Sequence, residues 1–151
     1  GGESFVWKHI DGDKVVKSTS TRLLGVSCDY EVNADFWCRS LKTYNKVFPE
    51  SKITPIAFCI IENDSSYFMT TQKFINGTDA TEEEIRRDLR KRGFRPCKNK
   101  ETGYSRNIYF DGYYLIDDVR ESNVIKSGGE FYYIDVGCYI VNNPDNYEFI
   151  D

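Results

Sequence analysis

One long amphipathic helix between two groups of strand-like segments constrains the fold of this chain more than any other feature. The apolar residues of segment 29–48 recur every three or four positions: Tyr30, Ala34, Trp37, Leu41, Tyr44 and Phe48. This spacing places them on one face of a helix, and such a face packs against a core. Ser27 or Asp29 can cap the start of the helix, and Pro49 marks its end.

Strand-like segments lie on both sides of the helix along the chain. Residues 4–10 and 15–19 are separated by Asp11-Gly12-Asp13. They predict a hairpin, because Gly adopts the positive φ that a tight turn requires. Residues 53–61 and 67–75 predict a second pair of strands, separated by polar residues.

A second, shorter helix is predicted to begin at Thr81. Thr81 and Glu84 have the spacing of a capping box, and Gly93 is expected to end the helix. The C-terminal half of this segment is basic, with Arg86, Arg87, Arg90, Lys91 and Arg92. A solvated face that suits the negative end of the helix explains this cluster most simply, and a phosphate-binding patch is the alternative.

Further hairpins are predicted in the last third of the chain. Two of them are centred on glycine turns: residues 107–110 with 113–116, and residues 124–126 with 130–134. The polar residues 96–102 are expected to form a loop, and the tail after Asn142 shows no strong pattern. Strands, one long helix, more strands, a second helix and paired hairpins together indicate an α+β fold.

The size and charge of the chain argue against several classes of protein. The 151 residues suffice for a single domain with its own core. The net charge of −4 includes no long block of either sign, so there is no strong nucleic-acid signal. No apolar run approaches the roughly 18 residues of a membrane span, and no signal peptide is evident. We therefore expect a cytoplasmic protein without a membrane partner.

The cysteines and the single histidine limit the chemistry further. The five cysteines are widely spaced and form no CxxC pair: Cys28, Cys38, Cys59, Cys97 and Cys138. We expect them to be buried free thiols. His9 is the only histidine, which argues against a zinc site and against Ser-His-Asp or Cys-His catalysis in their usual forms.

Three oxygen-bearing residues carry the strongest chemical signal. Asn123 follows Asp118 by five positions, and Asp135 follows Asn123 by twelve. A strand, a Ser-Gly-Gly turn and a second strand separate Asn123 from Asp135, so these side chains should lie side by side, with Asp118 in the loop just before them. Carboxylate and amide oxygens are the ligands that Mg²⁺ prefers. The alternative is that all three are ordinary turn residues of a β-meander.

This arrangement resembles the catalytic loop and the following Asp-Phe-Gly element of protein kinases. The resemblance implies that Asp118 accepts or orients the proton of a substrate hydroxyl. It also implies that Asn123 and Asp135 hold the Mg²⁺ that bridges the phosphates of ATP. Asp135-Val136-Gly137 then corresponds to Asp-Phe-Gly, with Val in place of Phe.

A series of weaker motifs within residues 40–140 resembles the kinase domain found in polyvalent proteins of phages and conjugative elements. Their order is more specific than any one of them. The motifs are Asn45-Lys-Val-Phe-Pro-Glu50, Met69-Thr-Thr-Gln-Lys-Phe-Ile75, Ala80-Thr-Glu-Glu-Glu-Ile85, Arg92-Gly-Phe94 and the segment from Asp118 to Asp135.

This resemblance implies a minimal protein-kinase-like fold in a single domain, residues 1–151. A small β-rich N-lobe with one long helix would occupy residues 1–73. A reduced C-lobe, carrying the catalytic-loop hairpin, would occupy residues 74–151. The resemblance also implies ATP and Mg²⁺ as cofactors, an unidentified phosphate acceptor as partner, and room for flanking domains of a larger polypeptide.

Lys17 is the candidate for the phosphate-pairing lysine of a kinase N-lobe. Val15-Val16-Lys17 is similar to the Val-Ala-Ile-Lys strand of kinases, and Glu31, in the first turn of the long helix, is the natural ion-pair partner. The alternatives are an ordinary edge-strand lysine, Lys14 as a weaker competitor, and Glu31 as a residue that only complements the helix dipole. Gln72 ends the strand that leads to the hinge, where adenine would lie, although backbone atoms usually bind it.

The chain departs from kinases in two ways. Ile116 and Asp117 stand where kinases carry His-Arg, which argues against control by an activation loop. The first hairpin has no GxGxxG motif, and the carboxylates of Asp11 and Asp13 would repel a triphosphate. Two hypotheses for the function follow. The first is an ATP- and Mg²⁺-dependent phosphotransferase acting on a hydroxyl of a protein or small molecule. The second is a catalytically inactive kinase-like binding module, which the short chain favours.

Overall fold

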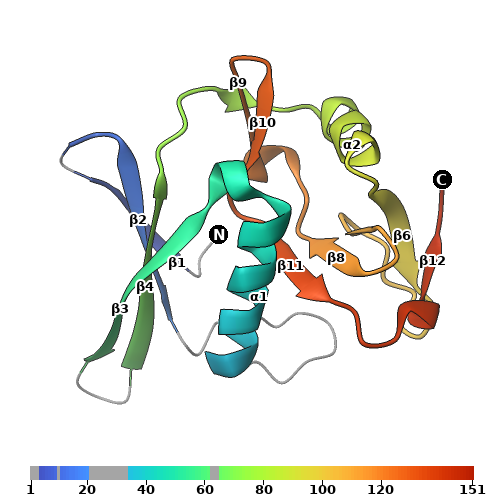
Figure 1. Cartoon of the computed structure of the whole chain (residues 1–151), viewed down its shortest axis with the longest axis horizontal. Coiled ribbons are helices and arrows are strands. Elements are labelled where there is room, and N and C mark those ends of the chain that lie inside the picture. Colours follow the sequence, from blue (N-terminus) through green and yellow to red (C-terminus); the bar gives the residue numbers. More distant parts are fainter. Residues whose placement is uncertain (1–3, 10, 21–33, 62–64) are drawn as a thin grey trace.

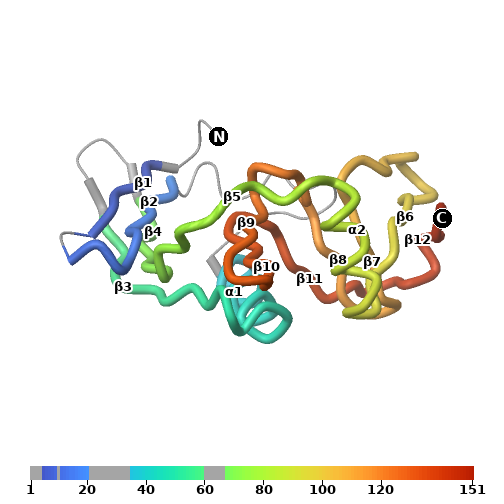
Figure 2. Tube along the Cα trace, turned by 90° about the horizontal axis from the view of Figure 1, so that it is seen from above, coloured from blue at the N-terminus to red at the C-terminus, as the bar shows by residue number. Residues whose placement is uncertain are grey.

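The computed structural model describes residues 4–9, 11–20, 34–61 and 65–151. Within these residues it contains two α-helices and three antiparallel sheets. Figures 1 and 2 show an elongated molecule, with the first four strands at one end and the C-terminal strands at the other. This mixture of helices and sheets confirms the predicted α+β class and is compatible with a small kinase-like fold.

The N-terminal sheet contains four strands in the order β1-β2-β4-β3. Its strands are β1 (Ser4–Lys8), β2 (Lys14–Ser20), β3 (Ile53–Ile61) and β4 (Ser65–Lys73). The predicted first hairpin is confirmed: Gly12 has a φ of 75°, and β1 and β2 pair antiparallel. The second predicted pair is also confirmed, with β4 two residues earlier than expected at each end.

Helix α1 (Ala34–Val47) lies between this sheet and the C-terminal strands (Figure 1). The predicted start at residue 29 lies outside the described residues, and the helix ends one residue before the predicted position. A 3₁₀ turn, Pro49–Ser51, follows it. On the sheet side the ring of Trp37 stacks on that of Phe68 at 4.2 Å. On the other side the Ser40 hydroxyl donates to the carbonyl oxygen of Cys138 at 3.0 Å.

A small three-stranded sheet and helix α2 follow β4. The sheet has the order β10-β9-β5, from β5 (Thr78–Asp79), β9 (Val124–Ser127) and β10 (Glu130–Tyr133). Helix α2 (Glu82–Lys91) begins with the predicted capping box, in which Thr81 and Glu84 bond each other's backbone amides. The φ values of Gly128 and Gly129 are both positive, which lets the chain reverse between β9 and β10.

A five-stranded sheet completes the fold, in the order β11-β8-β7-β6-β12. Its strands are β6 (Arg95–Asn99), β7 (Tyr109–Phe110), β8 (Tyr114–Asp117), β11 (Gly137–Ile140) and β12 (Tyr147–Phe149). A 3₁₀ turn, Glu121–Asn123, leads into β9, and another, Pro144–Asn146, leads into β12.

One sequence prediction in this sheet is wrong. Residues 96–102 do not form a loop throughout, because β6 covers most of them, with Cys97 and Asn99 buried on one face. The tail after Asn142, which shows no strong sequence pattern, contains β12: this strand pairs with β6, and the rings of Phe110 and Tyr147 lie 5.3 Å apart. Charged residues interrupt both strands, since Lys98 of β6 and Glu148 of β12 pair at 2.8 Å, so neither sequence shows an apolar run.

The core belongs mainly to residues after 80. One buried cluster joins the end of α1 to α2, β8, β9, β10 and β11, and contains Tyr44, Phe48, Ala80, Ile85, Leu89, Phe94, Tyr109, Ile116, Val119, Val124, Tyr133, Val136 and Cys138. A second cluster lies within the five-stranded sheet: Cys97, Ile108, Phe110, Leu115 and Val141. The predicted C-terminal half of the helical stripe, Tyr44 and Phe48, is therefore confirmed as core.

The thiols are only partly as predicted. Cys97 and Cys138 are buried and free, and burial raises the pKa of the Cys97 thiol to about 12. Cys38 is exposed, so the prediction of a buried thiol is wrong there, and Cys28 lies outside the described residues. Among the described residues no helix is both long and apolar enough to cross a membrane. The proposed division of the chain at residue 73 stays a prediction.

Candidate functional site

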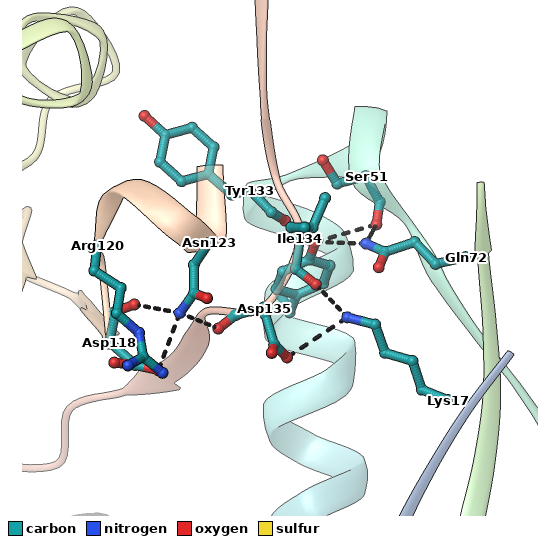
Figure 3. Close-up of polar contacts among 10 residues, drawn as sticks. Lys17, Ser51, Gln72, Asp118, Arg120, Asn123, Tyr133, Ile134 and Asp135 are labelled. Carbon is teal, nitrogen blue, oxygen red and sulfur yellow. Dashed lines mark hydrogen bonds and ion pairs between the residues drawn. The ribbon is translucent and has the colours of Figure 1, made fainter. Parts of the chain in front are cut away.

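Lys17 reaches out of the N-terminal sheet to the chain that follows β10. It lies in the middle of β2, and its side chain is only 13% exposed. Its ammonium group donates to the carbonyl oxygen of Ile134 at 2.7 Å and lies 3.5 Å from an Asp135 carboxylate oxygen. Lys17 therefore links the sheet to Asp135, the residue that the sequence predicts as a metal ligand (Figure 3).

Asn123 holds the other side of the same segment. Its side-chain amide nitrogen lies 2.9 Å from the carbonyl oxygen of Asp118, 3.0 Å from an Asp118 carboxylate oxygen and 3.0 Å from the carbonyl oxygen of Asp135. The residue is only 5% exposed. Because the amide nitrogen makes all of these contacts, the amide oxygen of Asn123 is left without a partner among the described residues.

Asp118 sits directly after β8 with a left-handed backbone, φ 56°. This conformation is uncommon for residues other than Gly, and Asp and Asn tolerate it best. Its carboxylate is about half exposed and also accepts from Arg120 at 2.9 Å. The neighbouring Asp117 accepts the backbone N–H of Asp118, and burial raises the pKa of the Asp117 carboxyl.

The structure thus brings together four of the five predicted site residues. Contacts run from Asp118 through Asn123 to Asp135 and on to Lys17 (Figure 3). Glu31 lies outside the described residues, so its pairing with Lys17 stays a prediction. Lys14 is exposed, and its position three residues before Lys17 puts it on the other face of β2. It is therefore the poorer candidate.

The oxygen atoms at this site fit a small divalent cation. No group of three His, Cys, Asp or Glu side chains in the described residues could hold a metal ion. Asn123 instead offers an unpartnered amide oxygen, and Asp135 offers a carboxylate that is 67% exposed. An amide oxygen and an exposed carboxylate are ligand types that suit Mg²⁺, which keeps several waters and binds substrate phosphates as well.

A cavity of about 200 Å³ adjoins these residues. Its polar end is formed by Lys17, Asn123 and Asp135, and its walls are mostly apolar. The remaining lining residues are Val6, Val15, Gln72, Lys73, Phe74, Ile75, Ser122, Ile125 and Ile134. Residues from both the N-terminal sheet and the C-terminal part therefore enclose it, as expected of a ligand site between two layers.

A larger cavity of about 520 Å³ lies beside residues 119–122, and it includes neither Lys17 nor Asp135. The two cavities share Ser122. Because the predicted phosphate-binding and metal-binding residues line the smaller cavity alone, the smaller one is the candidate for a nucleotide.

The Asp11-Gly12-Asp13 turn does not lie beside Lys17. The carbonyl oxygen of Asp13 accepts the backbone N–H of Phe74 at 2.8 Å, which places the turn at the Phe74 end of the cavity. Lys17 is four residues farther along an extended strand, or roughly 13 Å away. Repulsion between these carboxylates and a phosphate chain at Lys17 is therefore weaker than the sequence alone implies.

Comparison with protein families decides the membership of this chain. A family model described as a serine/threonine/tyrosine kinase found in polyvalent proteins, Kinase-PolyVal, matches residues 1–142. The chain belongs to the Kinase-PolyVal family. Comparison with curated proteins and with solved structures gave no match. The family match covers Lys17, Asp118, Asn123 and Asp135, and ends before β12.

Sequence reasoning missed two participants in this Kinase-PolyVal site. Ile134 contributes a backbone carbonyl, which leaves no trace in the sequence. Arg120 contacts Asp118 from two positions away, and a basic residue so close to a candidate catalytic Asp was a usable signal. Gln72, which the sequence placed near the expected adenine position, lines the cavity, although backbone atoms were expected to bind the base.

Proposed function

We propose that this Kinase-PolyVal chain transfers the γ-phosphoryl group of ATP to a hydroxyl of a protein or a small molecule, and that it requires Mg²⁺. The observation that carries this proposal is the continuous set of contacts from Asp118 through Asn123 and Asp135 to Lys17 at one end of a cavity. When bound, ATP supplies the phosphoryl group, and Mg²⁺ neutralises charge on its oxygens.

Lys17 would bind phosphate oxygens in this proposal. Its ammonium group is held by the Ile134 carbonyl, so it is already oriented toward the polar end of the cavity. A single carboxylate lies beside it, at the loose distance of 3.5 Å. The positive charge of the ammonium group is therefore not fully neutralised, and it can still attract an anionic ligand. This attraction is stronger than at the surface, because the side chain is mostly buried.

Asn123 and Asp135 would hold the metal ion. Asn123 is locked by its amide nitrogen, so its oxygen cannot turn away without the loss of contacts to Asp118 and Asp135. The Asp135 carboxylate can rotate, since it is exposed and contacts only Lys17 among the described residues. Fixed oxygens cost little reorganisation when charge develops, and this is the main contribution that phosphoryl transfer asks of a protein.

Asp118 would orient the acceptor hydroxyl and receive its proton. The Asn123 amide holds one of its carboxylate oxygens in place, and the residue is exposed enough to meet an acceptor from outside. Arg120 lies on the same oxygen, but this exposed ion pair is weak and is open to exchange with an incoming substrate. Positioning of the hydroxyl close to the phosphoryl group would add to the electrostatic contribution of the metal-binding oxygens.

The second candidate function is a catalytically inactive binding module of the same family. The first hairpin favours it, because its sequence has no GxGxxG motif to cover the phosphates of a nucleotide. Such a module would bind nucleotide and Mg²⁺ through the same cavity without transfer.

Substitution of Asp118 by Asn tests the proposal. Asn tolerates the left-handed backbone and can still accept from Asn123, so the fold should be unchanged while proton transfer is lost. We expect Mg²⁺-dependent transfer from γ-labelled ATP to casein, to the chain itself and to water to fall by at least about 100-fold. Asp111→Asn is the matched control, because Asp111 caps the turn before Tyr113 and Tyr114 away from the site.

The outcomes separate the two functions. An Asp118→Asn variant that transfers as fast as the original chain would refute the catalytic role. ATP with Mg²⁺ at a hundred times its Kd should stabilise the chain by roughly 2.7 kcal/mol in thermal unfolding. Stabilisation without any transfer would favour the binding module, and the absence of both would overturn the nucleotide site itself.

A further inference from the structure

Gln72 occupies an unusual position at the inner end of the cavity. It lies near the end of β4 and is only 4% exposed, yet it lines the cavity together with Lys17 and Ile134. Its amide nitrogen donates to the Tyr44 hydroxyl at 3.0 Å and to the Ser51 carbonyl oxygen at 2.5 Å. Both contacts lie on the side away from the cavity, toward α1 and the turn that follows it.

The contacts fix which way the amide faces. The Ser51 carbonyl oxygen can only accept a hydrogen bond. The Tyr44 hydroxyl donates its single proton to the carbonyl oxygens of Ser51 and Tyr133, so it can only accept from Gln72. Burial raises the pKa of Tyr44, which keeps that proton in place. A reversed Gln72 amide would set its oxygen against two acceptors, so the hydrogen-bond network excludes it.

The amide oxygen of Gln72 is therefore left to the cavity. It has no partner among the described residues. This oxygen is also accessible. Among the described residues, the Ser51 hydroxyl oxygen is the one fully buried side-chain polar atom that lacks a partner, so the unpartnered Gln72 oxygen is not fully buried. Figure 3 shows the oxygen turned to the side on which the Lys17 ammonium lies. The cavity thus has one fixed hydrogen-bond acceptor at its inner end.

The rest of the cavity suits a flat aromatic ring. Val6 and Val15 come from the N-terminal sheet, and Ile125 and Ile134 come from the β9–β10 part. The volume of about 200 Å³ is below that of complete drug-sized pockets, so it suits one ring system, with any phosphates at the polar end. A ring in this slot meets the Gln72 oxygen with its edge.

We propose that Gln72 selects adenine over 6-oxopurines, by accepting a hydrogen bond from the 6-amino group of the base. Guanine and hypoxanthine carry a carbonyl oxygen at that position, and two acceptors would face each other in a buried site. A site built around a fixed polar group rejects a ligand that leaves the group unpaired more strongly than an apolar site does. The inference rests on the proposed nucleotide site, and it adds the identity of the base.

Competition between ATP and inosine triphosphate tests this, because the latter carries a 6-oxo group on an otherwise similar nucleotide. We expect the full chain with Mg²⁺ to bind ATP at least about tenfold more tightly, measured by calorimetry. In Gln72→Met, which keeps the length of the side chain and lacks the carbonyl, the ratio should fall toward one. Thr43→Val is the matched control: it removes a hydrogen bond to the Arg39 carbonyl oxygen within α1, does not line this cavity, and should leave the ratio unchanged.

Each outcome bears on one claim. Equal binding of ATP and inosine triphosphate by the unaltered chain would overturn the role of Gln72 and leave the nucleotide site standing, and this comparison needs no variant to fold. An unchanged preference in a folded Gln72→Met variant would overturn it as well. Failure to bind either nucleotide would overturn the proposed function instead.

Discussion

The two ends of this molecule bury different kinds of residue. In the four-stranded N-terminal sheet the buried positions among the described residues are polar: Ser18, Thr70 and Gln72. The part after residue 80 buries two apolar clusters instead. Large apolar residues of the sheet are exposed, including Phe5, Trp7 and Phe58, each at least 50%.

The two parts therefore contribute differently to the stability of the molecule and to the candidate site. The C-terminal part carries Asp118, Asn123 and Asp135 on strands and turns packed around an apolar core, which gives them fixed positions. The sheet contributes Lys17 and Gln72, and these contact the rest of the molecule through carbonyl oxygens and a hydroxyl. Such polar contacts are weaker per residue than apolar packing, but they depend strongly on geometry. The candidate site lies between the polar contacts of the N-terminal sheet and the apolar core of the C-terminal part.

The largest effect is expected from a cavity in the C-terminal core. Ile116 is fully buried in the larger cluster, so Ile116→Ala should lower the free energy of unfolding by about 2–5 kcal/mol. Phe58→Ala is the comparison in the sheet: the ring is 53% exposed, and the loss should be below about 1 kcal/mol. Urea unfolding measures both. Equal losses would mean that the sheet is stabilised by apolar packing after all.

A smaller effect is expected when the polar link between the two parts is removed. Lys17→Met keeps the length of the side chain but leaves the Ile134 carbonyl without its charged donor. The free energy of unfolding should fall by about 1–2 kcal/mol, and stabilisation by ATP with Mg²⁺ should disappear.

Lys14→Met provides the matched control for this link. The same substitution, made on the exposed face of the same strand, should change stability by less than about 0.5 kcal/mol and leave the nucleotide response intact. A similar response of the two variants to ATP would remove Lys17 from the site.

The smallest effect concerns pH and the link between α2 and β9. The Lys126 ammonium at 2.6 Å, followed by the backbone N–H of Thr81, lowers the pKa of Glu84 to about 2. A carboxyl with a lowered pKa in the folded chain contributes stability above its unfolded pKa, near 4.3, and loses it as the pH falls toward 2.

Glu84→Gln should therefore be less stable than the original chain at pH 6, and the difference should vanish between about pH 4.5 and pH 2. Unfolding in urea across that pH range measures this, with Glu83→Gln, an exposed residue of the same helical turn, as control. A difference that stays constant down to pH 2 would show that Glu84 acts through packing and not through its charge.

Local patterns predicted much of the fold. The capping box of α2, the glycine turns of three hairpins and the core positions Tyr44 and Phe48 depend on residues near one another in the chain, and the structure confirms them. Contacts between residues far apart in the chain were harder to predict from the sequence. Strand β12 forms through its pairing with β6, which lies 50 residues earlier in the chain, and neither strand has an apolar run that would predict it.

The site shows the same limit. Asn123 and Asp135 were predicted to lie side by side because one hairpin connects them, and the Asn123 amide contacts the backbone carbonyl of Asp135 and the carboxylate of Asp118. The direction of the Gln72 amide depends on Tyr44 and Ser51, which are 28 and 21 residues away. No spacing rule relates these three positions, so only coordinates reveal that the amide oxygen faces the cavity.

The left-handed backbone at Asp118 has a consequence for how such a domain would change over evolutionary time. Most residues cost roughly 1–2 kcal/mol in this conformation, whereas Asn and Gly are cheap there. A lineage released from selection for catalysis would therefore replace the carboxylate by Asn or Gly long before it accepted Ala or Val. If Asp118 has the proposed catalytic role, an Asn at this position in a relative would mark the loss of that role with the fold retained.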